Sequence, residues 1–507
     1  MALALLAIVA LAAALRLLGA RAPHPIHRDG LQYLACARAA SAGDWRHVAA
    51  ADYSPGYPTL VALAARAAGF RADRPPRWIP ERHRFEVADA QRDAPLLRAA
   101  LGVSLLFGAL AVLPAFAVGA ALGGPRVGLW SALALALQPY HALYAGYVLT
   151  ESSFFFFLLL TLAAAAWLAR VQRPRTGWLA GIAVGIAGTL AFFVRPEVLA
   201  VLLPAAVLGT LRPSRGRALF GMALGFALLA GPYLWIYNAE RAGPSGAVVL
   251  TPKRPVAQLA ASALDAPTAF VRRLVRNLGQ LVEYGHPLVL ALALTGAVLA
   301  WRSGGRSARR LVALVLAAAA LYLGVVSAVR IDHRLVLGVG VLLVPLAGVS
   351  LERVRVALAS RWGRARAIGA LVVVLLASTV PILVHKSRPR RTHLLEAAAV
   401  VRRERGEARG MVLVHDPRLA YYAGGRWCAL AALDHVVDPE QAARLIARGE
   451  VVVLGLERGR EPDAAALGRA SGRRLEPVAV IEPAPGERFR AYEIYTVAPR
   501  AGEGAAR

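Results

Sequence analysis

Apolar runs recur through the first 384 residues, separated by short basic gaps and by two longer polar segments. A helix of about 20 apolar residues is long enough to cross the hydrocarbon core of a bilayer. The pattern therefore predicts an α-helical polytopic membrane protein with about 11 transmembrane helices. The predicted spans cover residues 1–19, 98–121, 127–143, 149–169, 178–194, 198–211, 218–236, 287–301, 311–328, 335–350 and 367–384. The first run lacks a basic leader and contains Arg16, which favours an uncleaved span over a signal peptide.

The gaps between the spans indicate which way the chain crosses the membrane. Alternate gaps are rich in arginine: Arg126; Arg170, Arg173 and Arg175; Arg212, Arg215 and Arg217; Arg302, Arg306, Arg309 and Arg310; and Arg353, Arg355, Arg361, Arg364 and Arg366. Glu352 is the single acid among them. An excess of Lys and Arg marks cytoplasmic loops. We therefore predict that the amino terminus lies inside and the carboxyl terminus outside.

Two outer segments and a distinct C-terminal region complete the predicted organisation. Residues 20–97 form a long first outer loop, whose mixture of arginines and aromatics suits helices on a membrane surface, and residues 237–286 form a second loop. Beyond the last span, helix-like stretches alternate with short apolar runs, which is typical of a small α/β domain. We expect residues 1–384 to form a transmembrane module and residues 385–507 an extracytoplasmic α/β domain.

Composition supports a membrane protein and excludes other classes. Hydrophobic residues make up 57% of the 507 residues and charged residues 18%, compared with about 45–50% and about 25% in soluble domains. The formal charge of +28 comes from basic residues that are almost all arginines, with Lys253 and Lys386 the only lysines. Many of these arginines lie in short gaps between apolar runs, which indicates topology signals rather than nucleic-acid binding. Two cysteines, Cys36 and Cys428, exclude a disulfide framework. One bridge between them is possible, but we expect two unpaired side chains.

Ionisable residues at the outer ends of the spans are the candidates for chemistry, because a charge near hydrocarbon depth is costly unless it faces a cavity or a partner. Three groups lie there: Asp29 after the first span, Glu151 at the start of the fourth, and a basic set of Arg195, Arg330, His333 and Arg334. Helix capping is the alternative explanation for Asp29 and Glu151. Anchoring at the membrane surface is the alternative for the basic set.

Taken together, these side chains suit a group transfer. Carboxylates can take a proton from a hydroxyl and orient it. Arginines can hold a phosphate through two hydrogen bonds and stabilise the negative charge that develops on a leaving group. The set predicts a reaction outside the membrane between a lipid-phosphate-linked donor and an acceptor alcohol, and it does not by itself identify the donor as a sugar.

Short motifs follow one another in a distinctive order. They are Leu15-Arg16-Leu17, Asp29 with Tyr33, the segment Tyr53-Ser54-Pro55-Gly56-Tyr57-Pro58-Thr59-Leu60, Gln138-Pro139-Tyr140 followed by Glu151, Arg195-Pro196, Pro232 to Asn238, and Arg334 ahead of Pro345. In this order and topology the chain resembles the polyprenyl-phosphate-dependent glycosyltransferases of the C superfamily. That family includes protein O-mannosyltransferases and the aminoarabinose transferase that acts on lipid A. The resemblance covers about residues 5–350.

This resemblance implies an inverting sugar transfer from an undecaprenyl- or dolichyl-phosphate donor to a hydroxyl of a lipid, glycan or protein acceptor. The reaction would take place at the outer face of the plasma membrane, among membrane lipids. Asp29 corresponds to the family's general base, and Glu151 to a second acid that orients the acceptor or the base. Arg195 and Arg334 are placed like residues that contact the donor phosphate.

Three further residues belong to the candidate substrate contacts through the same resemblance: Tyr33, Tyr57 and His141. Many relatives carry a second acid directly after the first, where this chain has Gly30. That departure puts in doubt any role that needs neighbouring carboxylates. The sequence also suggests that His415-Asp416-Pro417 and the run from Tyr421 to Gly425 form a polar, aromatic turn. We expect this turn to have a structural role, with contact to the acceptor as the alternative.

Metal dependence and other functional classes stay open. Hard divalent cations need several oxygen ligands, and no Asp-x-Asp pair lies near Asp29, so we expect no bound metal, with a divalent cation as the alternative. Scattered histidines (His24, His27 and His47) are the weaker candidates for a transition metal.

A transporter or lipid flippase would favour charges in mid-span or broken helices. A non-catalytic envelope-assembly protein would have no need of Asp29 and Glu151 on one side.

Overall fold

The structure is a computed structural model that describes the chain except residues 22–25, 80–83, 86–91, 172, 211–214, 242–265, 330–332, 387–391, 407–410, 425–426, 430–438, 461, 484–489 and 499–507. The chain divides into two compact units. The helical unit comprises Met1–Arg21, Val48–Leu60 and Leu101–Ser387, and the α/β unit comprises Ala22–His47, Val61–Ala100 and Arg388–Arg507. The first outer loop is thus shared between the units.

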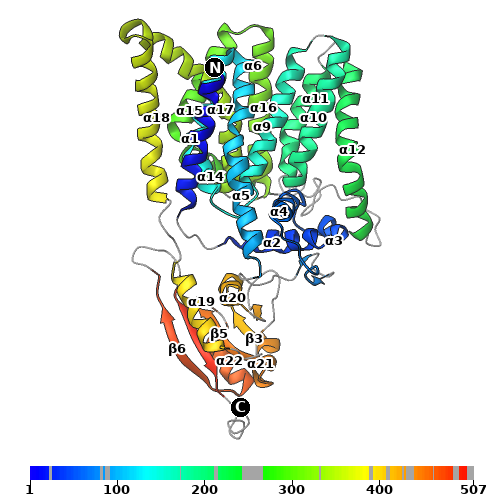
Figure 1. Cartoon of the computed structure of the whole chain (residues 1–507), viewed down its shortest axis with the longest axis vertical. Helices are drawn as coiled ribbons and strands as arrows, with labels where there is room; N and C mark the ends of the chain where they lie inside the picture. Colours follow the sequence, from blue (N-terminus) through cyan, green and yellow to red (C-terminus); the bar gives the residue numbers. More distant parts are fainter. Residues whose placement is uncertain are drawn as a thin grey trace. The chain divides into compact units, whose positions relative to one another are not determined.

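The helical unit is a bundle of apolar helices (Figure 1). Its elements are α1 (Ala2–Ala20), α6 (Val112–Gly123), α7 (Pro125–Ala136), α8 (Pro139–Tyr144), α9 (Glu151–Arg170), α10 (Pro174–Val194), the 3-10 helix η2 (Pro196–Val198), α11 (Leu199–Thr210), α12 (Arg215–Arg241), α14 (Pro267–Tyr284), α15 (Pro287–Ser303), α16 (Arg306–Val329), α17 (His333–Trp362) and α18 (Arg364–Lys386). Three helices belong partly to each unit: α3 (Trp45–Ala50), α4 (Gly56–Ala67) and α5 (Ala94–Leu110).

The prediction of a polytopic helical protein is confirmed. Among the described residues, 8 helices are long and apolar enough to cross a membrane, or up to 9 if the bent pair α14 and α15 is one span. The predicted spans 127–143 and 198–211 are shorter than a full crossing helix, since α7 and α11 each have 12 residues. Pro139 explains the first of these, because a proline starts a new helix more readily than it continues one. The count of 11 spans stays a prediction.

Close backbone contact holds the centre of the bundle together. Of the helices long and apolar enough to cross a membrane, α17 is the most enclosed, since 94% of the residues in its apolar stretch are buried. A Cβ on Gly296 of α15 would lie 1.9 Å from the carbonyl oxygen of Leu346 on α17, and a Cβ on Gly348 would lie 2.1 Å from the Ser131 hydroxyl on α7. Small residues of this kind let membrane helices pack backbone against backbone.

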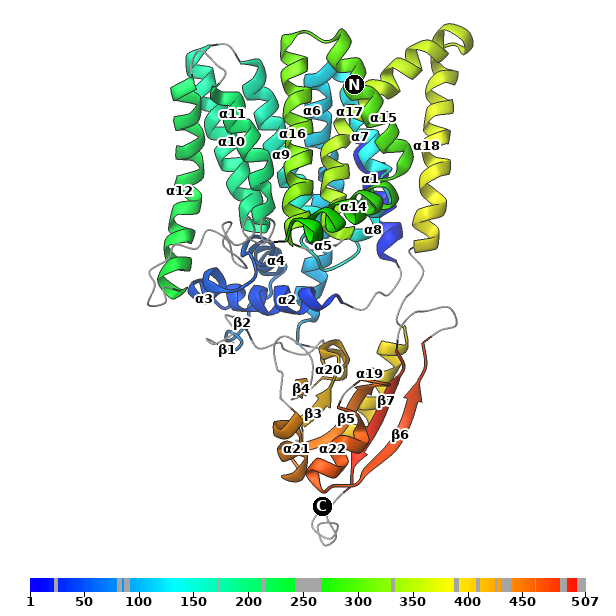
Figure 2. The ribbon, with the colours of Figure 1, turned by 180° about the vertical axis from the view of Figure 1, so that it is seen from behind.

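The two ends of the helical bundle differ in the residues that they carry. Helices α9 and α17 begin, and α10 ends, at one end of the bundle, where α14 lies across α16 and α17 (Figure 2). The axis bends by 104° between α14 and α15. The starts of α7, α10, α16 and α18 lie at the other end, with the basic residues Arg126, Arg173, Arg306 and Arg364. The helix directions therefore keep this arginine-rich end away from Glu151.

The α/β unit contains two sheets and several short helices. Its elements are α2 (Arg28–Ser41), β1 (Trp78–Ile79), β2 (Arg84–Phe85), α19 (Thr392–Arg405), β3 (Met411–Val414), α20 (Pro417–Ala423), β4 (Trp427–Ala429), α21 (Pro439–Ala447), β5 (Val451–Glu457), α22 (Ala464–Ser471), β6 (Leu475–Ile481) and β7 (Tyr492–Val497). The larger sheet has the order β4-β3-β5-β7-β6, with β3 parallel to β4 and β5, and β7 antiparallel to β5 and β6. The predicted α/β character of the C-terminal region is confirmed.

One local prediction in this unit is wrong. The segment expected to be a polar, aromatic turn is largely the helix α20. Asp416 caps this helix by accepting a hydrogen bond from the backbone N–H of Arg418 at 3.0 Å, and Pro417 starts it. Asp and Pro at these two positions are a recognised helix start, which the clustering of polar residues obscured. Cys36 is buried on α2, and the side chain of Cys428 lies outside the described part of the chain.

Candidate active site

Glu151 is the buried acid at the end of the bundle. It is the first residue of α9, and its side chain has no exposed surface. Its Oε1 accepts a hydrogen bond from Nη2 of Arg195 at 2.9 Å and lies 3.9 Å from Nη1 of Arg334. Its Oε2 has no hydrogen-bond partner among the described residues. A carboxylate in the first turn of a helix is favoured by the helix dipole, but the paired arginines show that Glu151 does more than cap.

Arg195 is fixed at the point where α10 ends. Its backbone is extended, and its N–H closes the last turn of α10 by donating to Ala191. Nε donates to the Thr150 hydroxyl at 2.7 Å while Nη2 donates to Glu151. The guanidinium carbon also lies 5.9 Å from the centre of the Phe154 ring, within the range of a cation–π contact. Arg195 therefore contacts Thr150, the N-cap of α9, and both Glu151 and Phe154 in the first turn of that helix.

Arg334 completes the cluster from a third helix. It is the second residue of α17, and its side chain is 9% exposed. Glu151, Arg195 and Arg334 thus come from three helices whose ends meet. We call these three residues the acid–arginine cluster.

The charges of the acid–arginine cluster favour an anion. Two guanidinium groups surround one carboxylate, so the three side chains carry a net charge of +1. The amino-terminal ends of α9 and α17 add the positive ends of two helix dipoles. A phosphate can accept paired hydrogen bonds from guanidinium groups. The arrangement could therefore hold an anion such as a phosphate, with Glu151 accepting a hydrogen bond from Arg195.

Gly56 and Tyr57 are the first two residues of α4. Tyr57 is fully buried and bonds through its hydroxyl to Ser104 at 3.0 Å. A Cβ on Gly56 would lie 2.7 Å from the backbone of Phe193 and 2.9 Å from N of Val194. These contacts fix α4 against the last turn of α10, next to Arg195. They assign Tyr57 a supporting position within the bundle.

The close approach at Gly56 yields a prediction. Gly56→Ala must displace the backbone before Arg195, and overpacking of this kind costs about 1–3 kcal/mol. We expect a lower unfolding midpoint in detergent and weaker binding of a polyprenyl phosphate. Gly102→Ala on α5 is the matched control, because no atom lies within 4 Å of its added Cβ. Equal midpoints and equal affinities for the two variants would show that this contact does not support Arg195.

His141 occupies a similar supporting position. It is fully buried on α8, and its Nδ1 lies 2.5 Å from Nη2 of Arg16, which is also fully buried. Arg16 donates as well to the carbonyl of Ala12. An arginine within an apolar span signals a special site. Here Arg16 joins α1 to α8 through its contact with His141. The sequence did not predict this contact.

Asp29 and Tyr33 belong to the α/β unit. Asp29 lies in the first turn of α2, after the N-cap His27, whose Nδ1 accepts the Asp29 N–H at 3.3 Å and lies 3.4 Å from Oδ2. The alternative explanation, that Asp29 caps the helix that follows it, is wrong, because α2 starts at Arg28 and its N-cap is His27. The Asp29 side chain is 24% exposed, so it can meet a substrate. Tyr33 is buried on α2.

Some candidates lie outside the described residues. Arg330 and His24 do so, and of His333 the structure describes the backbone at the start of α17. In the described part of the chain, no group of three or more His, Cys, Asp or Glu side chains is arranged to hold a metal ion.

Comparison with solved structures shows that this chain shares its fold with ArnT, AglB and AftD. ArnT from Cupriavidus metallidurans bound to undecaprenyl phosphate matches with a TM-score of 0.64 and 13% identity, over 96% of this chain and 97% of that one. Archaeal oligosaccharyltransferase AglB from Archaeoglobus fulgidus, in complex with an inhibitory peptide and a dolichol-phosphate, matches with 0.51 and 11%, over 89% and 69%. Arabinofuranosyltransferase AftD from Mycobacteria matches with 0.51 and 14%, over 98% and 40%. Comparisons with protein-family models and with curated proteins found no match.

Proposed function

We propose that this protein is an integral membrane glycosyltransferase that transfers a sugar from a polyprenyl-phosphate donor to an acceptor hydroxyl. The observation that carries the proposal is the buried carboxylate of Glu151 beside two arginines at one end of the bundle. Two further facts support it. The fold is shared with ArnT bound to undecaprenyl phosphate. The acid–arginine cluster also carries a net positive charge, which would attract the negatively charged phosphate of a lipid.

The proposed reaction is a single inverting displacement. The acceptor oxygen forms a bond to the anomeric carbon while the bond from that carbon to the phosphate oxygen breaks. The acceptor proton passes to the Asp29 carboxylate as the general base. Arg195 and Arg334 stabilise the charge that develops on the departing phosphate, and Glu151 holds the arginines in place. These steps need no metal ion, because a lipid monophosphate is already a leaving group once its charge is stabilised.

We place the reaction on the outer face of the plasma membrane. Positively charged residues are retained on the cytoplasmic side of membrane proteins, and the helix starts that carry Arg126, Arg173, Arg306 and Arg364 lie at the end of the bundle away from Glu151. The acid–arginine cluster then faces outward. The acceptor is a hydroxyl on a lipid, a glycan or a protein.

The function is tested by comparing lipid-linked sugars and envelope glycans in a deletion strain by mass spectrometry. We expect a glycan to lose one sugar and the corresponding polyprenyl-phosphate sugar to accumulate. Both changes should be reversed by the wild-type gene and not by an Asp29→Asn copy expressed at the same level. If both pools stayed unchanged, a transferase would be excluded and a transporter or assembly role favoured.

Arg334→Ala tests the phosphate contact separately. A hydrogen bond to a charged group contributes about 1.5–3 kcal/mol, so we expect the variant to bind undecaprenyl phosphate about 10–100-fold more weakly. The purified variant should keep the acceptor preference of the wild type. Arg364→Ala is a matched control, since this arginine is exposed at the start of α18. An Arg334→Ala protein with wild-type affinity for the lipid would remove Arg334 from the proposed site.

A further inference from the structure

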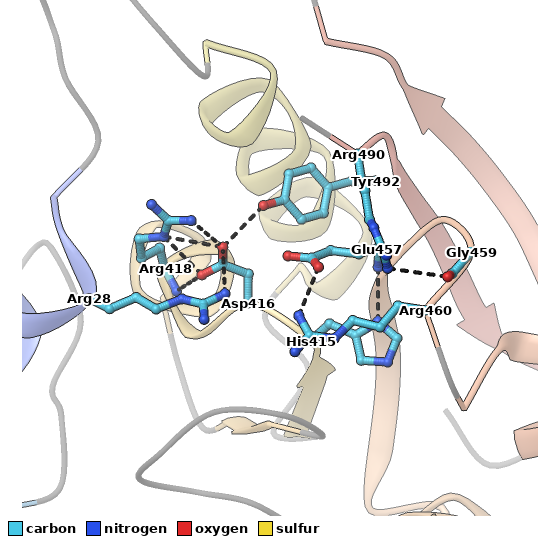
Figure 3. A network of polar contacts seen from close by, with 9 residues as sticks. All are labelled: Arg28, His415, Asp416, Arg418, Glu457, Gly459, Arg460, Arg490 and Tyr492. Atoms are coloured by element: carbon cyan, nitrogen blue, oxygen red, sulfur yellow. Dashed lines mark hydrogen bonds and ion pairs between the residues drawn. The ribbon is translucent and has the colours of Figure 1, made fainter. Parts of the chain in front are cut away.

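Asp416 is a buried acid in the α/β unit that the proposed reaction does not use. It lies between β3 and α20, and its side chain has no exposed surface. Its two oxygens accept from Arg418, at 3.0 and 3.2 Å from Nε and 2.5 Å from Nη2. The Tyr492 hydroxyl donates to Oδ2 at 3.3 Å. Figure 3 shows the carboxylate enclosed by these partners.

A further partner of Asp416 comes from the first loop. Nη2 of Arg28 lies 3.6 Å from Oδ2 of Asp416 (Figure 3). Arg28 is the first residue of α2, directly before Asp29. The Arg28 side chain is 40% exposed, so this ion pair can be removed without leaving a cavity in the core.

A second contact joins the same two segments. The backbone N–H of Ile26 donates to the Tyr422 hydroxyl at 2.8 Å, and Ile26 is 4% exposed. Tyr422 belongs to α20, the helix that Asp416 caps. The segment before Asp29 is therefore held to α20 at two points, one through a backbone amide and one through the Arg28 side chain.

The charged and hydrogen-bonding neighbours of Asp416 favour its ionised form. Burial raises the pKa of Asp416, but the hydrogen bonds and charge of Arg418 and the charge of Arg28 outweigh it and lower the pKa to about 2. Burial raises the pKa of Tyr492 above its usual range, so its hydroxyl stays a donor. A carboxyl whose pKa is lowered in the folded state stabilises that state above its unfolded value of about 4, and this contribution disappears as the pH falls through about 2.

We propose that Asp416 and Tyr422 position the catalytic Asp29 by holding the start of α2 against α20. The C-terminal α/β domain then takes part in catalysis through Arg28 and Ile26. This inference rests on the proposed role of Asp29 as the base. Its physical reason is that Asp29 shares the first turn of α2 with Arg28, so a shift of that turn moves the carboxylate. A displacement of about 1 Å at a reacting group can cost about 100-fold in rate.

The test uses Arg28→Ala and Tyr422→Phe, because a change at Asp416 would leave Arg418 buried without its acid and could unfold the domain. Each variant should lower kcat about 10-fold or more, with the KM for the lipid donor within about 2-fold of wild type. Arg28→Lys, which keeps the charge, should recover part of the lost turnover. Arg458→Ala is the matched control in the same unit, since that arginine forms exposed ion pairs with Glu482 and Glu493 and should leave kcat unchanged.

Amide hydrogen exchange measured on the same variants separates this inference from the function itself. Arg28→Ala and Tyr422→Phe should increase exchange in residues 26–31 and leave strands β3 and β5 protected. Unchanged exchange in residues 26–31 would overturn the positioning contact whatever the activity. Increased exchange with wild-type kcat would show that the contact exists and does not serve catalysis, which also overturns the proposal. If Asp29→Asn retained full activity, the proposed base would fail, while the exchange result would still decide the contact.

Discussion

Asp29→Asn is expected to lower the rate of sugar transfer by about 10²–10⁴-fold, the usual contribution of a general base. Asparagine keeps the size of the side chain and cannot accept the acceptor's proton. The side chain is 24% exposed in the first turn of α2, so the substitution should not disturb folding. The measurement is turnover by purified protein with its lipid-linked donor, together with the affinity for undecaprenyl phosphate, which should stay near wild type.

The control for this variant is Asp44→Asn, which changes an acid of the same loop. Asp44 accepts hydrogen bonds from its neighbour His47 at 2.9 and 3.0 Å, and we assign it no part in the reaction. Its turnover should match wild type. An Asp29→Asn protein that turned over as fast as the control would remove Asp29 from the mechanism.

Arg195→Ala is expected to have the second large effect, on both stability and donor binding. The substitution removes the guanidinium that contacts Thr150 and Glu151 at 2.7 and 2.9 Å. Breaking a buried ion pair at one partner costs about 3–5 kcal/mol, because the other charge stays buried. We expect a clear fall in the unfolding midpoint and undecaprenyl phosphate binding at least about 10-fold weaker.

The double variant Arg195→Ala with Glu151→Gln separates the two effects. The glutamine side chain is neutral, so Glu151→Gln should restore much of the stability that Arg195→Ala removes, and it should not restore donor binding. Glu151→Gln alone should lower the rate of transfer, because the arginines lose the acid that orients them. Recovery of donor binding in the double variant would show that Arg195 acts on folding and not on the phosphate.

The hydrophobic pattern predicts most of the helical unit because long apolar runs have few alternatives in a membrane. The predicted spans 149–169 and 178–194 correspond closely to α9 and α10. The pattern fails at α7 and α8, where the predicted span also contains the polar residues Gln138 and His141 and Pro139 begins a new helix. It fails again at α20, where a capping acid and a proline begin a helix too short to show a period.

The acid–arginine cluster could be anticipated because topology alone brings together residues at the same ends of helices. Glu151, Arg195 and Arg334 are such residues, and the structure joins them. Tyr57 and His141 are buried within the bundle against Ser104 and Arg16. Sequence position shows that such residues are near a site, but not which way their side chains face. The tie between Arg28 and Asp416 joins residues 388 positions apart, and no local pattern encodes it.

If the acid–arginine cluster binds the phosphate of a polyprenyl lipid, the purified protein should distinguish undecaprenyl phosphate from undecaprenol, which differ in the phosphate alone. The decisive measurement is the affinity of the protein for each of these two lipids. Wild-type protein should prefer the phosphate by about 100-fold or more, and the double variant Arg195→Gln with Arg334→Gln should lose most of that preference. Equal affinities for the two lipids in the wild type, or an unchanged preference in the double variant, would contradict the account.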